Sequence, residues 1–537
     1  MKTQEELAAN DANDANGAHQ EFFFAPHSRH WRHSRLILLV FLWFAIVAVP
    51  PAVAQDAATT IKTAQYALGM IRGPQRIDAI NTVEYWGEGY AYSFGQAYRP
   101  DMPWPPARAT YHVSLSYFIS AMRVDVTRSN PQGPIQGGGG LPLAAPVRQI
   151  QVVNGSFAWN ESVPGAGFVP GTTAAPSPGS ANDRLLQLWT TPYGALKAAE
   201  RAGASARVTQ ESGATAISFP LPGSLAGITM RVTLNAKNQV ERVETRTDNP
   251  VLGDVVTETT YSDYKDLGEI ESDVLFPSHI VQKQGGFPVL DLTITRTDAN
   301  NPYLVFPVPD NVENGPRSSP PVKVDTEKVA EGVWYLTGGT HHSVAVEFRN
   351  YVVLFECPQN EERAVAVLDT VKKTIPSKPI RYVVNTHHHF DHSGGLRSCA
   401  AEGATIITQS ENKPYYEKVW ALPHTLNPDR LARTPKRPIV EGVEEKRVLT
   451  DGQRTVELYH LQGSNHSATM LIGFLPKEKV LIEADVYTPG PANSPPVPAS
   501  SEMLNLNENI KRLRLDVQRI TPLHGRLVTI DDLRRGL

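Results

Sequence analysis

The chain has 537 residues, more than one ordinary domain holds, and 41% of them are hydrophobic, which is enough for real cores. Its formal net charge is −4, so it lacks the basic footprint of a nucleic-acid-binding protein. The two cysteines, Cys357 and Cys399, are too few for a disulfide framework and do not form a zinc-knuckle pattern. We expect two buried thiols; a single bridge between them is the alternative in an oxidising compartment.

The N-terminus has the three-part layout of a secretory signal peptide. Arg29, Arg32 and Arg35 precede an apolar run of 14 residues at 36–49, and small residues before Gln55 offer a cleavage site. A membrane span needs about 20 apolar residues, so the run is short for one. We expect residues 1–54 to be a signal peptide with a long n-region. An uncleaved anchor, which would be the sole membrane attachment, is the alternative. Both predict export, which in a bacterium means the periplasm.

Residues 55–306 carry a mostly β pattern. Apolar and polar residues alternate over 230–234 and 290–294, as in strands with one face in water. Apolar residues at helical spacing predict helices over 56–73 and 183–202. We therefore expect a β-rich domain in which one or two helices pack on a sheet. The pattern faintly resembles the half-barrels of lipoprotein-carrier proteins, and the domain would then bind an apolar ligand, dock a partner or support the next domain.

Three segments predict chain without a core of its own. Residues 131–146 and 163–180 are rich in glycine, proline and small residues, which is typical of mobile loops. The glycine run at 137–140 lacks the lysine and the strand-to-helix context of a phosphate-binding loop. Residues 307–321 have the composition of a linker. We therefore expect a second domain over residues 322–537.

Strands and helices alternate in this second part, which is typical of a layered fold. Strands are predicted at 333–336, 343–348, 351–355 and 380–384, and a helix at 361–375. The fold class predicted for the whole chain is therefore α+β with two domains.

Four histidines and one aspartate follow the apolar run 380–384, in the segment Thr-His-His-His-Phe-Asp-His at 386–392. His466, Asp485 and His524 each come directly after a later apolar run. Ligands at the carboxyl ends of strands meet at one edge of an α/β sheet. Imidazole suits zinc, and carboxylate suits zinc or a harder metal. The sequence therefore predicts a site for two metals.

The pattern H-x-H-x-D-H, followed by a lone histidine, a lone aspartate and a last histidine, resembles the metallo-β-lactamase superfamily over residues 322–537. The resemblance implies an αββα sandwich with two metals at its edge. It implies one metal on His387, His389 and His466, a second on Asp391, His392 and His524, and Asp485 bridging them. Glu356 stands where the family commonly has aspartate, which leaves open how the outer partners orient His387.

The resemblance also implies a zinc-dependent hydrolase with a small-molecule substrate. A hydroxide that bridges two Zn²⁺ ions would attack the carbonyl of an ester, lactone, thioester or amide, while Asp391 orients it and passes a proton. Iron and manganese are alternative metals. Asp485 favours the layout of glyoxalase II and related lactonases, because class B1 β-lactamases carry cysteine there. The alternatives are a class B3-like β-lactamase, a mononuclear iron enzyme resembling persulfide dioxygenases, and a non-enzymatic lipid- or partner-binding protein with an inert metal domain.

Three further side chains are predicted to line the substrate site. His341 and His342 follow a pair of glycines, and Tyr487 comes two residues after Asp485. The insertion at 410–438 is rich in aromatic residues and is predicted to cap the substrate or, alternatively, to pack on its own domain.

Overall fold

A computed structural model describes residues 56–72, 77–270, 272–434 and 436–537. The predicted signal peptide at 1–54 lies outside these residues. None of the helices within the described ranges has the length and apolar character that crossing a membrane requires.

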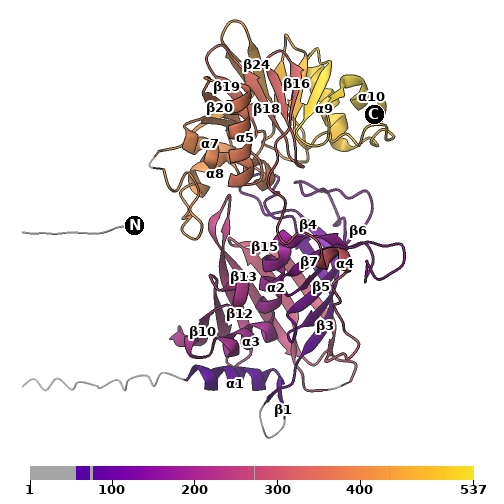
Figure 1. Cartoon of the computed structure of the whole chain (residues 1–537), viewed down its shortest axis with the longest axis vertical. Helices are drawn as coiled ribbons and strands as arrows, with labels where there is room; N and C mark the ends of the chain where they lie inside the picture. The colour runs from indigo at the N-terminus through magenta and orange to yellow at the C-terminus, as the bar shows by residue number, and fades with distance from the viewer. Residues whose placement is uncertain (1–55, 73–76, 271, 435) are drawn as a thin grey trace, which may run out of the picture. The chain divides into compact units, whose positions relative to one another are not determined.

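The β-rich region is built on one antiparallel sheet of 13 strands in the order β8-β7-β6-β5-β4-β3-β15-β14-β13-β12-β11-β10-β9 (Figure 1). The strands are β3 (Thr82–Tyr92), β4 (Pro106–Ser116), β5 (Ala121–Ser129), β6 (Val147–Asn154), β7 (Phe157–Glu161), β8 (Ala175–Pro176), β9 (Arg207–Glu211), β10 (Ala214–Pro220), β11 (Thr229–Leu234), β12 (Val240–Asn249), β13 (Gly253–Lys265), β14 (Phe276–Gln284) and β15 (Phe287–Ala299). A separate pair, β1 (Ile71–Arg72) and β2 (Ile77–Asp78), precedes them. The alternation that predicted strands at 230–234 and 290–294 is confirmed by β11 and β15.

Three helices pack on this sheet: α1 (Ala57–Ala67), α2 (Ala181–Thr190) and α3 (Pro192–Ala202). Their apolar faces share one core with the strands, through residues such as Ile61, Leu188 and Leu196. The helix predicted at 183–202 is two helices, because Pro192 cannot continue the backbone hydrogen bonds of α2 and instead begins α3. The helix predicted at 56–73 ends earlier, before Gly69, whose φ of +70° is left-handed.

The C-terminal region contains two sheets. The first has the order β16-β17-β18-β19-β20-β21-β22 and the second β23-β24-β25-β26-β27-β28. The first comprises β16 (Thr326–Ala330), β17 (Val333–Leu336), β18 (Ser343–Glu347), β19 (Val352–Phe355), β20 (Ile380–Val384), β21 (Thr405–Gln409) and β22 (Ile439–Val443). The second comprises β23 (Lys446–Thr450), β24 (Thr455–His460), β25 (Leu471–Leu475), β26 (Val480–Glu483), β27 (Arg519–Pro522) and β28 (Val528–Thr529).

Helices cover the outer faces of both sheets, which gives a helix–sheet–sheet–helix order (Figure 1). The first sheet is covered by α5 (Glu361–Thr374), α7 (Leu396–Glu402) and α8 (Asn412–Val419), and the second by α9 (Ser501–Arg512) and α10 (Ile530–Gly536). Strand β19 contributes side chains to two separate cores. Leu354 packs against the helices, whereas Val353 and Phe355 pack between the sheets, because successive side chains of a strand point to opposite faces.

The β-rich region and the C-terminal region pack as one compact unit. The backbone N–H of Asp254 donates to the Pro423 carbonyl at 2.8 Å, and the N–H of Ala468 donates to the Tyr98 carbonyl at 2.9 Å. The predicted linker at 307–321 is itself partly packed. It contains the short helix α4 (Asp310–Glu313), and Val312 is buried against the β-rich region.

The expectation of two free thiols is wrong. Cys357 and Cys399 form a disulfide, which joins the segment after β19 to helix α7. Both sulfur atoms lie in the core under the helices, so the pairing depends on packing that a sequence separation of 42 residues does not reveal.

Replacing both cysteines by serine should lower the free energy of unfolding by up to about 4 kcal/mol, because the bridge shortens the loop available to the unfolded chain. Urea unfolding of wild type and variant, each with and without reductant, measures this. Reductant should bring the wild type to the level of the variant and leave the variant unchanged. Two alkylatable thiols in denatured, unreduced wild type would contradict the bridge.

Candidate metal centre

The candidate ligand side chains come from five segments that end at one edge of the two sheets. The first segment is the loop after β20, which leads into α6 (Phe390–Ser393). His466 follows β24, Asp485 follows β26 and His524 follows β27. His341 comes from the connection between β17 and β18. Two groups of possible ligand atoms result, each with all its atoms within 4.8 Å of one another: His387, His389, His466 and Asp485, and His341, Asp391, His392 and His524.

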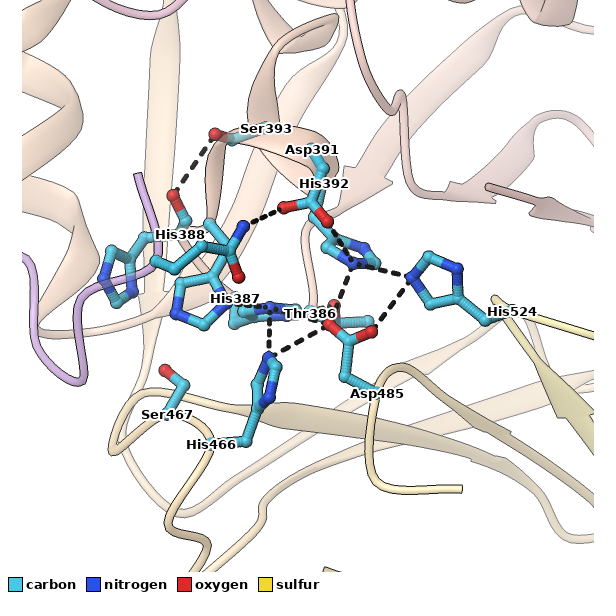
Figure 2. A network of polar contacts seen from close by, with 12 residues as sticks. Thr386, His387, His388, Asp391, His392, Ser393, His466, Ser467, Asp485 and His524 are labelled. Atoms are coloured by element: carbon cyan, nitrogen blue, oxygen red, sulfur yellow. Dashed lines mark hydrogen bonds and ion pairs between the residues drawn. The ribbon is translucent and has the colours of Figure 1, made fainter. Parts of the chain in front are cut away.

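The first group surrounds the Nε2 atom of His387. This atom lies 2.9 Å from His389 Nδ1, 3.3 Å from His466 Nε2 and 3.2 Å from Asp485 Oδ2. All three imidazoles therefore direct one ring nitrogen at the same small volume, which borders one oxygen of Asp485. Figure 2 shows His387, His466 and Asp485 of this group.

The second group shares Asp485 with the first. Its Oδ2 atom lies 2.9 Å from His392 Nε2 and its Oδ1 atom 2.9 Å from His524 Nε2. The two histidine nitrogens are 3.2 Å apart, and Asp391 Oδ2 is 3.7 Å from His392 Nε2. The carboxylate of Asp485 thus contacts both groups, as Figure 2 shows.

Hydrogen bonds to the outer ring nitrogens show that these residues fit a metal. His389 Nε2 lies 2.8 Å from the Ala97 carbonyl, which can only accept, so Nε2 carries the proton and Nδ1 presents a lone pair. The Thr386 hydroxyl donates to Glu356 and therefore accepts from His387 Nδ1 at 3.0 Å, which leaves a lone pair on His387 Nε2. Two lone pairs facing each other at 2.9 Å repel unless a cation lies beside them.

The charges of the site also favour cations. Burial lowers the pKa of His387 to about 3, so its imidazole is neutral, the form that binds metal. Burial would lower the pKa of His392, but Asp485 and Asp391 outweigh it and raise that pKa to about 10. Burial alone would raise the pKa of Asp485, but His392 and His466 hold it well below its usual range. Asp485 and Asp391 therefore favour positive charge beside them, whereas His387 is held neutral, and both effects suit a bound cation.

Glu356 holds the first segment in place. Its buried carboxylate accepts from the backbone N–H and the hydroxyl of Thr386, both at 2.6 Å. Burial raises its pKa to about 7, although His392 and Thr386 oppose the rise. Glu356 thereby orients His387 through Thr386. The sequence had left open whether a glutamate at this position could do so.

Two outer partners come from the β-rich region, and sequence reasoning missed both. The Ala97 carbonyl accepts from His389, and Gln96 Nε2 donates to Asp391 Oδ1 at 2.7 Å. The backbone N–H of Gly139 donates to Gln96 Oε1 at 2.9 Å, which fixes the orientation of the amide. The connection between β3 and β4 therefore contacts ligands of both groups.

The glycine run at 137–140 is not the free loop that its composition predicted. A Cβ atom on Gly138 would lie 2.7 Å from His389 Cε1, and the Gly137 N–H donates to the Asn465 carbonyl at 2.8 Å. A residue without a side chain is needed for this close approach. The run of four glycines is itself the signal in the sequence, but its composition does not distinguish a close approach from a free loop.

A cavity of about 560 Å³ opens beside the metal centre. The C-terminal region contributes His341, Asp391, His466, Asp485, Thr488 and His524 to its lining, and the β-rich region contributes Tyr92, Ser93, Phe94, Gln96, Arg128, Gly139 and Gly140.

The structure places His341 in the cavity lining but does not bring His342 or Tyr487 there. His342 is 6% exposed and turns its Nδ1 atom to the Tyr335 hydroxyl. Tyr487 is 4% exposed and packs in the core beneath α9. His341 and His342 are successive residues just before β18, and they have different partners: His341 contacts Asp391, and His342 contacts Tyr335.

The insertion at 410–438 does not cap the cavity. Tyr416 is fully buried and donates to Asn385 Oδ1 at 2.6 Å, so α8 packs on its own sheet. The segment after α8 contacts β13, where the Thr425 N–H donates to Asp254. Loops of the β-rich region occupy the position that the insertion was expected to fill.

Changing Gln96 to alanine should weaken zinc binding roughly 10- to 100-fold, because Asp391 loses the donor that orients it. Isothermal titration of metal-free protein with zinc measures the affinity directly. Gln282→Ala is the matched control, because its amide bonds Thr259 on a neighbouring strand of the same sheet. Equal zinc affinity in wild type and Gln96→Ala would contradict the role of Gln96.

A family model described as the metallo-β-lactamase superfamily matches residues 336–524. Among solved structures, a metallo-β-lactamase from Pontibacter korlensis is 19% identical, with 40% of this chain and 96% of that chain covered and a TM-score of 0.31. One from Hirschia baltica is 18% identical, with 40% and 95% covered and a TM-score of 0.30.

The metallo-β-lactamase FIM-1 from Pseudomonas aeruginosa, in its mono-zinc form, is 16% identical, with 40% and 93% covered and a TM-score of 0.31. A search of curated proteins finds no match. The family match begins at Leu336, the last residue of β17, and ends at His524, two residues after the end of β27, so it includes all the candidate ligands. The C-terminal region of this chain, over residues 336–524, therefore belongs to the metallo-β-lactamase superfamily.

Proposed function

We propose that the chain is a zinc-dependent hydrolase that cleaves a small ester, lactone, thioester or amide. The observation that carries the proposal is the position of Asp485, whose two carboxylate oxygens contact two separate groups of imidazoles. In this proposal two Zn²⁺ ions bind per chain. One lies with His387, His389 and His466, the other with Asp391, His392 and His524, and Asp485 lies between them.

Bound zinc would lower the pKa of a water molecule and polarise the substrate carbonyl. The chain supplies orientation and proton transfer. Asp391 is held on both oxygens, with Gln96 at 2.7 Å from Oδ1 and His341 Nε2 at 3.0 Å from Oδ2. Asp391 therefore orients the nucleophile, and His341 is placed to hold or move a proton at Oδ2. Burial lowers the pKa of His341, so its imidazole is neutral and able to exchange a proton.

The cavity is closed on one side by the β-rich region and excludes bulk water from the ligand atoms of His387 and His389, which are fully buried. Asp391 and His524 line the cavity, so a carbonyl substrate bound in it would lie beside both side chains. Buried imidazoles and oriented carboxylates together support hydrolysis at neutral pH, in which the bond between the carbonyl carbon and the leaving group is broken.

The proposal also includes export of the chain and a separate role for each region. Residues 322–537 are the catalytic domain, and residues 1–54 direct the chain to an oxidising compartment such as the bacterial periplasm. The disulfide between Cys357 and Cys399 supports export, because such bonds persist in oxidising compartments.

Changing Asp485 to alanine should reduce kcat/KM to below roughly one-hundredth of the wild-type value, because even outer partners of a metal ligand contribute 10- to 100-fold. The assay is hydrolysis of a panel of lactones, thioesters, esters and β-lactams, with metal content measured on the same samples. Asp516→Ala is the control, because its side chain is 72% exposed and pairs with Lys479, which is not one of the candidate ligands. Retained hydrolysis in Asp485→Ala would contradict the proposal.

Removing metal with a chelator should abolish hydrolysis, and zinc should restore it, with close to two ions per chain in the active protein. Elemental analysis during restoration gives the stoichiometry. One iron ion per chain, with activity restored by iron and not by zinc, would instead favour the oxidative alternative.

A further inference from the structure

Arg128 is a cation in the wall of the metal-site cavity. It lies near the end of β5 in the β-rich region, outside the residues that the family model matches. It is the sole lysine or arginine among the described residues that line this cavity. The other lining residues that come from the β-rich region, among them Tyr92 and Phe94, are uncharged.

The charge of Arg128 is not neutralised within the protein. No carboxylate of the described chain lies within ion-pair distance of it, its Nε atom is buried without a hydrogen-bond partner, and Nη2 has only Gln149 Oε1 at 3.4 Å. Two other arginines of the same sheet, in contrast, are each paired with a carboxylate. Arg123 Nε lies 3.2 Å from Glu161, and Arg148 Nη2 lies 2.5 Å from Asp125. The guanidinium of Arg128 therefore keeps N–H donors that can bind an acceptor in the cavity.

Arg128 shares its cavity with several of the candidate metal ligands. Asp391, Asp485, His466 and His524 line the same cavity as Arg128, so a single small molecule can contact both. A guanidinium matches the planar geometry of a carboxylate and binds it through two parallel hydrogen bonds.

We propose that the cavity selects a substrate that carries a carboxylate, which Arg128 binds while the scissile carbonyl lies at the metal centre. This inference rests on the proposed hydrolase function and names its substrate class. The β-rich region thereby determines specificity, while the C-terminal region supplies the chemistry. Arg128 acts on substrate binding and not on the reacting atoms, so its removal should raise KM and leave kcat nearly unchanged.

The test compares substrates that differ only in charge. One pair is 5-oxotetrahydrofuran-2-carboxylate and its carboxamide, and a second is S-acetylthioglycolate and its amide. The zinc-loaded wild type should prefer the anionic member of the pair that it hydrolyses. Arg128→Ala should raise KM for that member roughly 10- to 100-fold, the cost of losing a charge-assisted hydrogen bond, and leave KM for the amide unchanged. Arg128→Lys should restore part of the preference.

Arg148→Ala is the matched control, because Arg148 lies on the adjacent strand and is paired with Asp125 outside the cavity. It should keep the wild-type preference. Equal kcat/KM for both members in wild type, or an unchanged preference in Arg128→Ala, would overturn the assignment of Arg128.

A binding measurement separates this inference from the hydrolase proposal. Succinate, which has no scissile bond, is titrated into the zinc-loaded proteins by calorimetry. If the wild type hydrolyses neither pair, the hydrolase proposal fails for these substrates, and succinate still tests the anion site. Binding at least roughly tenfold weaker in Arg128→Ala than in Arg148→Ala supports the site, and equal binding overturns it.

Discussion

The carboxylate of Asp485 is the contact on which the rest of the C-terminal region depends. Its oxygens lie within 3.2 Å of ring nitrogens from four histidines, which come from three separate segments of the chain. Its backbone is held at a φ of +62°, a left-handed conformation that few residues other than glycine adopt. Such strain persists where the surrounding structure compensates for it, and it is concentrated at functional sites. Removing this group would leave the facing imidazoles without a common anion.

The layers of the fold bring these segments to one edge. Strands β19 and β20 lie parallel in the first sheet, and β26 and β27 lie parallel in the second. Their carboxyl ends therefore point the same way within each sheet, and the residues that follow them meet. The alternation of apolar side chains on β19 serves both the helix layer and the space between the sheets. Burial of apolar side chains on both faces of the first sheet therefore stabilises the loops that carry the candidate ligands.

The β-rich region has a more direct relation to the site than its pattern suggested. It contacts His389 through Ala97 and Gly138, and Asp391 through Gln96. These contacts set which ring nitrogen of His389 is protonated and how Asp391 is turned. The same region forms a wall of the cavity, so changes in it alter the metal ligands and the space beside them together.

Local patterns in the sequence determined the elements of the fold. Period-two alternation predicted β11 and β15, the apolar run before residue 386 predicted β20, and the order of strands and helices predicted a layered C-terminal region. The residues of the H-x-H-x-D-H segment, and the three later residues that follow strands, pointed to one metal centre for the same reason. Each candidate ligand follows a strand closely in the chain, so the sequence alone shows both the strand and the ligand.

Only the tertiary structure decided the contacts between distant segments. Gln96 and Asp391 are 295 residues apart, and no periodicity relates them. The pairing of Cys357 with Cys399, the turning of His342 and Tyr487 into the core, and the docking of the glycine run against His389 likewise depend on packing. Backbone propensity and side-chain spacing act over a few residues, whereas these contacts form only when separate layers and loops are brought together by burial of their apolar faces.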